Sequence, residues 1–278
     1  MKAAAPIGWL AAALICAEAA AVEPPLPSPT PGGAVADDQL VFSANGSRLT
    51  GGFGAGGGSA TWVGNFGGGT VVGAGAEYQQ ISNAHWTLGT FSGAVAPGLR
   101  THLYVEGHEG AGDLGDRAFH YSLLAGGLLE QITSRLSVQL EERRIDIDRS
   151  HGNLPKLGLW FQLTPELLAS VSYAVSLGGN LGTHLGTGRI DYTGHGFSAI
   201  AGIAGGPAAP AVVGLGPGGG AVVVAPAPHL REGFGGIGKT FGRTDWLLLG
   251  DYQDVSGTKR TSITLNCTVH LHAPAQAP

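Results

Sequence analysis

The chain has 278 residues, a net charge of -5, only 13% charged residues and glycine at 49 positions. So few cationic side chains in a mildly acidic chain disfavour nucleic acid as a partner. Removal of a signal peptide that contains Cys16 would leave Cys267 as the single cysteine, which excludes an internal disulfide.

Residues 1–21 are predicted to be a secretory signal peptide. Lys2 precedes an apolar run that extends through Cys16, and small residues suited to cleavage follow at Ala19 and Ala21. The apolar run is too short to predict a membrane-spanning helix. We therefore expect the chain to be exported.

The rest of the chain is predicted to form a tether and one domain. Residues 22–37 are rich in proline and glycine, and prolines remove backbone donors and favour an extended conformation. We expect the domain at residues 38–272, followed by a short tail at residues 273–278. Nothing in the pattern predicts a second core.

The domain is predicted to consist of strands with one apolar and one polar face. In TSITLNCTVHL, residues 261–271, Ile263 and Leu265 alternate with Ser262 and Thr264, and successive strand residues point to opposite faces. The same alternation, in segments of about 8 to 13 residues separated by Gly, Asn, Asp and Pro clusters, occurs at residues 72–79, 99–107, 136–141, 156–163 and 169–176. Long helices are not predicted.

Strand length distinguishes a membrane barrel from the alternative, a soluble sandwich. Strands of about 9 to 13 residues, tilted near 45°, cross a hydrocarbon layer of about 25 to 30 Å, whereas soluble strands usually have about five or six residues. Closure also removes the exposed edges that such a sheet would leave. We therefore predict an all-β fold, an antiparallel up-and-down transmembrane β-barrel of about 12 strands in the bacterial outer membrane.

Tight and long connections alternate along the predicted strands. Short turns are expected at residues 134–136, 162–168 and 241–246, and longer loops at residues 106–118 and 146–153. This asymmetry is typical of outer-membrane barrels, whose periplasmic turns are short and whose outer loops are longer. Residues 206–220, GPAAPAVVGLGPGGG, are interpreted as an extended loop or plug.

The chain resembles small barrel-only outer-membrane proteins of Gram-negative bacteria. The resemblance rests on the predicted signal peptide, the alternating segments and the tight TPEL turn at residues 164–167 before a strand that contains Tyr173. In the same way the chain is similar to YaiO-like barrels and to the barrel ends of polysaccharide-secretion porins.

This resemblance covers most of residues 38–271 and implies a fold and a location, but no functional residues. The predicted partners are outer-membrane lipid, the outer-membrane assembly machinery and a polysaccharide secretion system. One departure is that such barrels commonly end on an aromatic residue, whereas this chain continues HAPAQAP beyond Leu271.

A phosphate-loop pattern occurs at residues 233–240, GFGGIGKT, with Gly238, Lys239 and Thr240 at the required spacing. That motif works between a strand and a following helix, whereas here a turn and another strand are predicted to follow. The glycines are therefore assigned to a strand, and no cofactor is expected.

A His-x-Ser pair occurs in FHYSLLAG, residues 119–126, where His120 and Ser122 share one face of a predicted strand. Such a pair could act as base and nucleophile, with Glu130 or Glu141 orienting the imidazole. It is similar to the lipid-facing His-x-Ser pair of outer-membrane lipid A deacylases.

The neighbouring residues argue against that role. Phe119, Tyr121 and Leu123 make the opposite face the predicted lipid side, which would turn His120 into the lumen. We therefore expect no enzyme, and an outer-membrane lipid hydrolase is the less favoured alternative.

Metal binding is not predicted. His270 and His272 share close, same-face spacing, but no carboxylate or cysteine completes a set of ligands. The mixed-charge run at residues 141–152 is interpreted as a solvated strand end and loop, with calcium or lipopolysaccharide contact as the alternative.

The polar faces carry the functional prediction. The candidate lumen-lining residues are Glu77, Arg100, His102, Glu106, His120, Glu141, Arg143, Lys156, Arg189 and Arg260. Both signs of charge occur, so we expect pairing across the interior rather than selection of one ion sign. A barrel of this size either holds a narrow passage or is filled by side chains. We predict a channel or export component for small solutes or a polysaccharide; the alternative is a plugged, structural or partner-binding barrel.

Overall fold

The computed structural model describes residues 38–50, 54–81, 84–113, 118–147, 150–207, 229–255 and 258–271. The predicted signal peptide, tether and C-terminal tail lie outside these residues, as does most of the predicted loop or plug. No helix among the described residues is long and apolar enough to cross a membrane.

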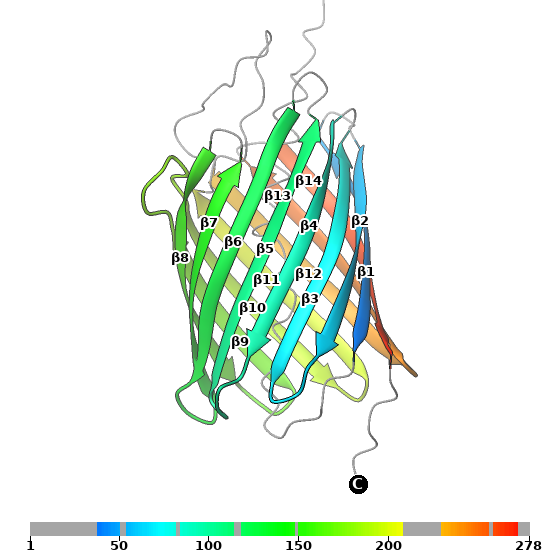
Figure 1. Cartoon of the computed structure of the whole chain (residues 1–278), viewed down its shortest axis with the longest axis vertical. Coiled ribbons are helices and arrows are strands. Elements are labelled where there is room, and N and C mark those ends of the chain that lie inside the picture. Colours follow the sequence, from blue (N-terminus) through cyan, green and yellow to red (C-terminus); the bar gives the residue numbers. More distant parts are fainter. Residues whose placement is uncertain are drawn as a thin grey trace, which may run out of the picture.

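The described residues form a closed barrel of fourteen strands. These are β1 (Gln39–Leu49), β2 (Gly54–Asn65), β3 (Thr70–Ile81), β4 (Ala84–Val95), β5 (Thr101–Asp113), β6 (Ala118–Gln131), β7 (Leu136–Ile147), β8 (Ser150–Gln162), β9 (Leu167–Val175), β10 (His184–Gly194), β11 (Phe197–Pro207), β12 (His229–Phe241), β13 (Thr244–Val255) and β14 (Thr258–His270). Each strand pairs antiparallel with the next, and β1 also pairs with β14 (Figure 1). The predicted closed antiparallel barrel is confirmed, whereas the expected number of about 12 strands is wrong.

Glycine-rich strands explain part of the undercount and the misplaced loops. β5 continues to Asp113 through Gly107, Gly110 and Gly112, although residues 106–118 were expected to form a loop. Likewise, β7 and β8 extend into the loop expected at residues 146–153, and the phosphate-loop pattern lies inside β12. A glycine shows no face preference in the sequence and weakens an isolated strand. In a closed barrel, hydrogen bonds from both neighbouring strands hold such a segment in the sheet.

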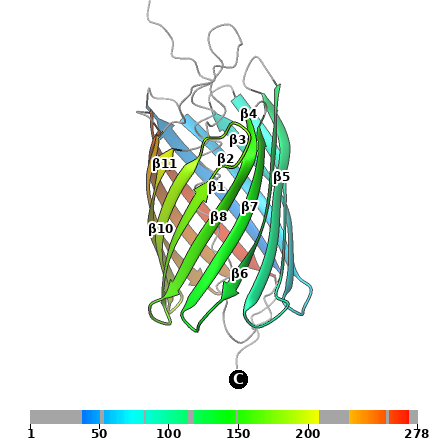
Figure 2. The same ribbon diagram turned by 90° about the vertical axis from the view of Figure 1, so that its left-hand side faces the viewer.

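The two ends of the barrel differ in their connections. The end that carries Gln39 and His270 has short connections, at residues 66–69, 96–100, 132–135, 163–166, 195–196 and 242–243. Short turns are typical of the periplasmic end of an outer-membrane barrel, and we name the opposite end the outer end. In Figure 2 the strands run between these two ends with a common tilt.

The alternation predicted for β14 separates the two faces of the wall. Ile263 and Leu265 are exposed on the outside, whereas Arg260 and Ser262 are buried on the inside. Directly paired residues of neighbouring strands lie on the same face of a sheet, so the register extends this assignment around the barrel. The outer surface is therefore apolar where it faces lipid, and the polar faces line the interior.

β6 is oriented opposite to its prediction. Phe119, Tyr121 and Leu123 are buried inside the barrel, while His120 and Ser122 belong to the outward face. Trp86 of β4 also points inward and packs edge to face on Phe119, with ring centroids 6.2 Å apart. The prediction failed because both faces of β6 carry apolar residues, and the barrel interior accepts the bulkier set.

Candidate functional site

Most of the expected lumen residues lie on the inner face of the wall. The structure places Glu77, His102, Glu106, Glu141, Arg143, Lys156, Arg189 and Arg260 on inward positions of their strands. Two expectations need correction. Arg100 is exposed in the turn between β4 and β5, and His120 faces outward because the inner and outer faces of β6 are the reverse of the prediction.

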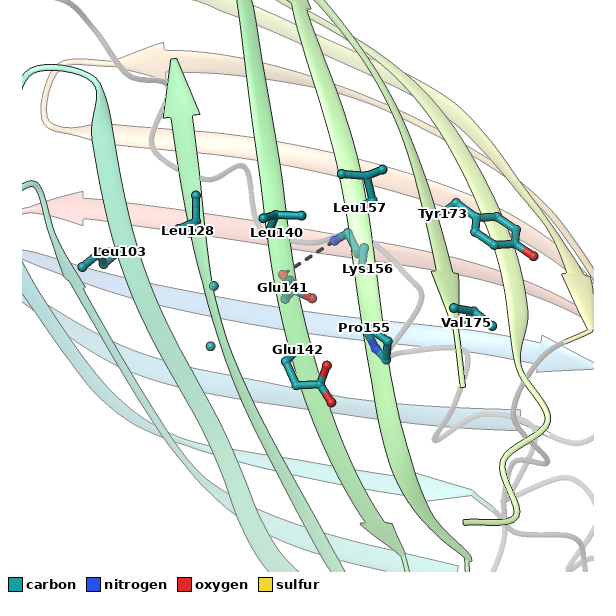
Figure 3. Close-up of a pocket in the computed structure, with 12 residues that line it drawn as sticks. Leu103, Leu128, Leu140, Glu141, Glu142, Pro155, Lys156, Leu157, Tyr173 and Val175 are labelled. Atoms are coloured by element: carbon teal, nitrogen blue, oxygen red, sulfur yellow. Dashed lines mark ion pairs between the residues drawn. The ribbon is translucent and has the colours of Figure 1, made fainter. Parts of the chain in front are cut away.

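Four charged residues and a tyrosine from β5, β7 and β8 form the inner charge cluster: Tyr104, Glu106, Glu141, Arg143 and Lys156. Glu141 accepts hydrogen bonds from Tyr104 Oη at 2.5 Å and from the Arg143 guanidinium. Lys156 Nζ lies 3.7 Å from Glu141 Oε2, the ion pair drawn in Figure 3, and Arg143 lies 3.8 Å from Glu106. The cluster is therefore a charge-balanced network that crosses four strands.

A glycine allows this network to cross β6. Tyr104, Gly127 and Glu141 are directly paired across β5, β6 and β7. A Cβ built on Gly127 would lie 2.6 Å from Tyr104 Oη and 2.6 Å from the Leu140 carbonyl oxygen. The tyrosine side chain therefore lies over Gly127 to reach Glu141.

We expect Gly127→Ala to destabilise the barrel by about 1 to 3 kcal/mol, because the new methyl group displaces Tyr104 and presses on backbone. Urea unfolding in phospholipid vesicles measures the effect. Gly126→Ala is the matched control, since its Cβ would meet only the Tyr104 carbonyl oxygen at 3.7 Å. Equal unfolding free energies for the two variants would contradict this account of the network.

Neutral polar side chains extend the network toward the periplasmic end. Gln139 is completely buried and donates to Tyr104 Oη at 2.8 Å, while its own Oε1 accepts from Trp160 Nε1 at 3.0 Å. The alternation at residues 136–141 and 156–163 puts Gln139 and Trp160 on the polar face, but they were not among the candidates, which were limited to ionisable residues. Their alternation with Leu140 and Leu159 was the available signal.

A second group of buried polar residues lies on β12, β13 and β14. Gln253 Nε2 donates to Glu232 Oε1 at 3.1 Å, and Arg260 lies 3.5 Å from Asp251. Ser262 is buried beside them, opposite Asp251 in the register. Arg260 was among the predicted lumen-lining residues. Glu232 was not, because glycines and Phe234 near it in β12 leave no clear alternation of polar and apolar residues.

The third group of inward polar residues is an ion pair on β10. Arg189 is buried and binds Asp191 of the same strand, with Nη2 2.6 Å from Oδ1. The two residues are separated by Ile190, which is exposed on the outside of the barrel. The pair therefore follows the expected alternation and lies on the inner face.

An apolar region occupies the inner wall of β4 and β6 near the outer end. Its members are Trp86, Leu88, Phe119, Tyr121 and Leu123, all buried. At 2% to 6% exposure, these side chains pack on one another and on the rest of the interior. The lumen therefore has an apolar wall as well as charged ones.

The outside of the wall carries a shallow hollow of about 530 Å³ over β5 to β9. One row of paired residues borders it: Leu103, Leu128, Leu140, Leu157 and Tyr173 (Figure 3). Its floor includes Gly126 and Pro155, which have small side chains in the next row. Because the lining is mostly apolar and faces outward, the hollow is open to lipid.

The described residues contain no group of three or more His, Cys, Asp or Glu side chains that could hold a metal ion. His270 instead contacts Asp245, with 2.8 Å between Nε2 and Oδ2. What the interior offers is paired charge, neutral hydrogen-bonding groups and two apolar regions, the one on β4 and β6 and a second formed by Ile200, Phe234 and Leu249 on β11 to β13.

A closed antiparallel barrel with an apolar exterior and a charged interior is the structure of a bacterial outer-membrane protein. No protein-family model matches the chain, and no curated protein matches it. Among solved structures, it is similar to the CymD monoaromatic hydrocarbon channel, with a TM-score of 0.62, 10% identity, and coverage of 99% of this chain and 96% of that one.

Two further solved structures have the same architecture. The Pseudomonas putida toluene transporter TodX matches with a TM-score of 0.54 and 9% identity over 85% of this chain and 90% of its own. A Pseudomonas aeruginosa FadL homologue matches with a TM-score of 0.55 and 10% identity over 84% of this chain and 90% of its own. At such low identity the likeness is one of fold, and the finer resemblance to YaiO-like barrels or polysaccharide-secretion porins stays a prediction.

Proposed function

We propose that the protein is a passive outer-membrane channel for small, mainly apolar solutes. The observation that carries the proposal is the apolar inner wall of Trp86, Leu88, Phe119, Tyr121 and Leu123 near the outer end. Aromatic and aliphatic side chains in a lumen bind apolar solutes, because the contact removes apolar surface from water. The inner charge cluster lies further toward the periplasmic end. Because its charges balance, it does not selectively repel cations or anions.

The structural neighbours support this substrate class. CymD is described as a monoaromatic hydrocarbon channel and TodX as a toluene transporter, and both have the barrel architecture seen here. Small aromatic molecules are therefore the first solutes to test. Passage of a sugar or of a polysaccharide strand is the second candidate, favoured by the hydrogen-bonding groups of Gln139, Glu141 and Gln253 inside the lumen.

The test compares entry of a neutral aromatic probe, 1-N-phenylnaphthylamine, into cells that have an intact lipopolysaccharide layer, with and without the protein. We expect the protein to accelerate entry. Phe119→Gln should slow it roughly fivefold, because about 1 kcal/mol of apolar contact is lost in the lumen. Phe91→Gln, which alters an exposed aromatic residue on the outer face of β4, is the control and should leave entry unchanged.

Liposome swelling with small sugars separates the alternatives. Sugar flux without aromatic entry would replace the proposed substrate class by the sugar candidate. Absence of both fluxes would contradict the channel and favour a plugged barrel that binds a partner. Migration of unheated and boiled samples on a gel shows that each variant is a folded barrel.

A further inference from the structure

Three side chains on the outer face of β5 and β6 contact one another close to the outer end of the barrel. His120 Nε2 lies 2.5 Å from Glu109 Oε1, and Ser122 lies beside Glu109 on the neighbouring strand. Glu109 and Ser122 are directly paired in the register, and His120 is two residues from Ser122 on the same face. A nucleophile, an imidazole and a carboxylate are thus brought together; we name them the outer triad.

The outer triad is accessible from outside the barrel. The side chains of Glu109 and His120 are 61% and 59% exposed. An exposed ion pair contributes little to stability, so stability alone does not account for the placement of these groups. A function of the outer triad would therefore depend on its access to the surrounding lipid.

Strand geometry gives the height of the outer triad in the membrane. Ser122 lies nine residues from Gln131, at the periplasmic end of β6. At about 3.4 Å per residue and a tilt of about 40°, that is roughly 23 Å along the membrane normal. The hydrocarbon band around such barrels is about 25 Å tall. With the lower edge of this band placed at Gln131, the Ser122 hydroxyl lies near its upper edge, where acyl chains of the outer leaflet join their head groups.

Apolar surface continues from the outer triad toward the periplasmic end. On the outward face of β6, Ser122 is followed by Leu124, Gly126 and Leu128, and the last two line the outer hollow. A Cβ at Gly126 would meet only one atom, 3.7 Å away, so space remains above this glycine. An acyl chain lying along β6 would fill that space and bring its ester to Ser122.

Arg144 provides a positive charge beside this path. It is exposed on the outward face of β7, where it pairs with Leu124, one row closer to the periplasmic end than Ser122. The carbonyl oxygen of an ester whose chain lies over Leu124 would be near the guanidinium. A cation at that position stabilises negative charge that develops on the oxygen during attack.

We propose that the outer triad cleaves ester-linked acyl chains from lipids of the outer leaflet. Ser122 Oγ forms a bond to the ester carbonyl carbon while its proton passes to Glu109. Glu109 passes this proton to His120, which gives it to the departing alcohol oxygen as the bond from the carbonyl carbon to that oxygen breaks. Water attacks the acyl-serine by the same route, so that a fatty acid leaves and the Ser122 hydroxyl is restored.

Purified full-length protein in detergent-lipid micelles tests the proposal. One arm uses a diacyl phosphatidylethanolamine and the other a purified lipopolysaccharide, and free fatty acid is measured in both. We expect release in at least one arm, which identifies the lipid. Ser122→Ala should reduce release to background, and Glu109→Gln should reduce it by about 10²-fold or more.

A long-chain fluorophosphonate provides a second readout, since it should label the peptide that contains Ser122. Thr261→Ala is the matched control, because Thr261 is an exposed hydroxyl on the outward face of β14. All variants alter outward side chains and are checked for heat-dependent gel migration. Release that persists in Ser122→Ala, or neither release nor labelling in the wild type, would overturn the proposal; channel flux is unaffected in either case.

Discussion

Leu265→Arg is expected to destabilise the barrel by about 2 to 4 kcal/mol, because it moves a charge to the lipid face near mid-membrane. Leu265 is exposed on the outside of β14 and lies five residues from His270. With the rise and tilt of a barrel strand, that distance is about 13 Å from the periplasmic end, close to the centre of the apolar band. Reversible unfolding in guanidinium with phospholipid vesicles measures the loss.

Thr264→Arg is the matched control on the neighbouring position. Thr264 points into the lumen, where it is paired directly with Asn45 and Leu249 and where an added guanidinium does not enter lipid, so its cost should be smaller. If both variants lost equal stability, the assignment of the two faces would fail. If Leu265→Arg were neutral, lipid would not surround β14.

Glu141→Ala is expected to cost about 3 to 5 kcal/mol, because it leaves the buried charges of Arg143 and Lys156 without their shared partner. The Glu141 side chain is 1% exposed and contacts both cations. The effect should lie in the lower half of that range, since Arg143 keeps Glu106 at 3.8 Å. The same unfolding titration in vesicles gives the value.

Glu142→Ala provides the comparison on the opposite face of the same strand. Glu142 faces the lipid-exposed hollow beside Leu140 and Pro155, so its removal takes a carboxylate away from apolar surroundings. We expect unchanged or increased stability. A larger loss for Glu142→Ala than for Glu141→Ala would reverse the assignment of inside and outside at β7.

The inner and outer surfaces of one strand segment thus serve different purposes in the two proposals. On β6, Phe119, Tyr121 and Leu123 face the proposed solute path, while His120 and Ser122 face the outer leaflet. Because alternate residues point to opposite faces, variants at neighbouring positions separate the two activities. Phe119→Gln should alter aromatic entry without altering lipid cleavage, and Ser122→Ala the reverse.

Alternation in the sequence was sufficient to predict the barrel and most of its two faces. Ile263 and Leu265 were expected outside and are exposed there, and Arg260 and Glu141 were expected inside and are buried there. A period of two follows from the geometry of a single strand, so it can be recognised without knowledge of the partners. Strand length then indicated a membrane-spanning barrel.

The tertiary structure alone decided the number of strands, the orientation of β6 and the contacts between charges. Glycine-rich β2 and β11 have no strong alternation, and they are strands because neighbours on both sides complete their hydrogen bonds. In β6 both faces are partly apolar, so alternation gave two faces without saying which is inner. Pairing with β5 and packing of Phe119 on Trp86 settled that choice, and thereby brought His120, Ser122 and Glu109 together on the outside.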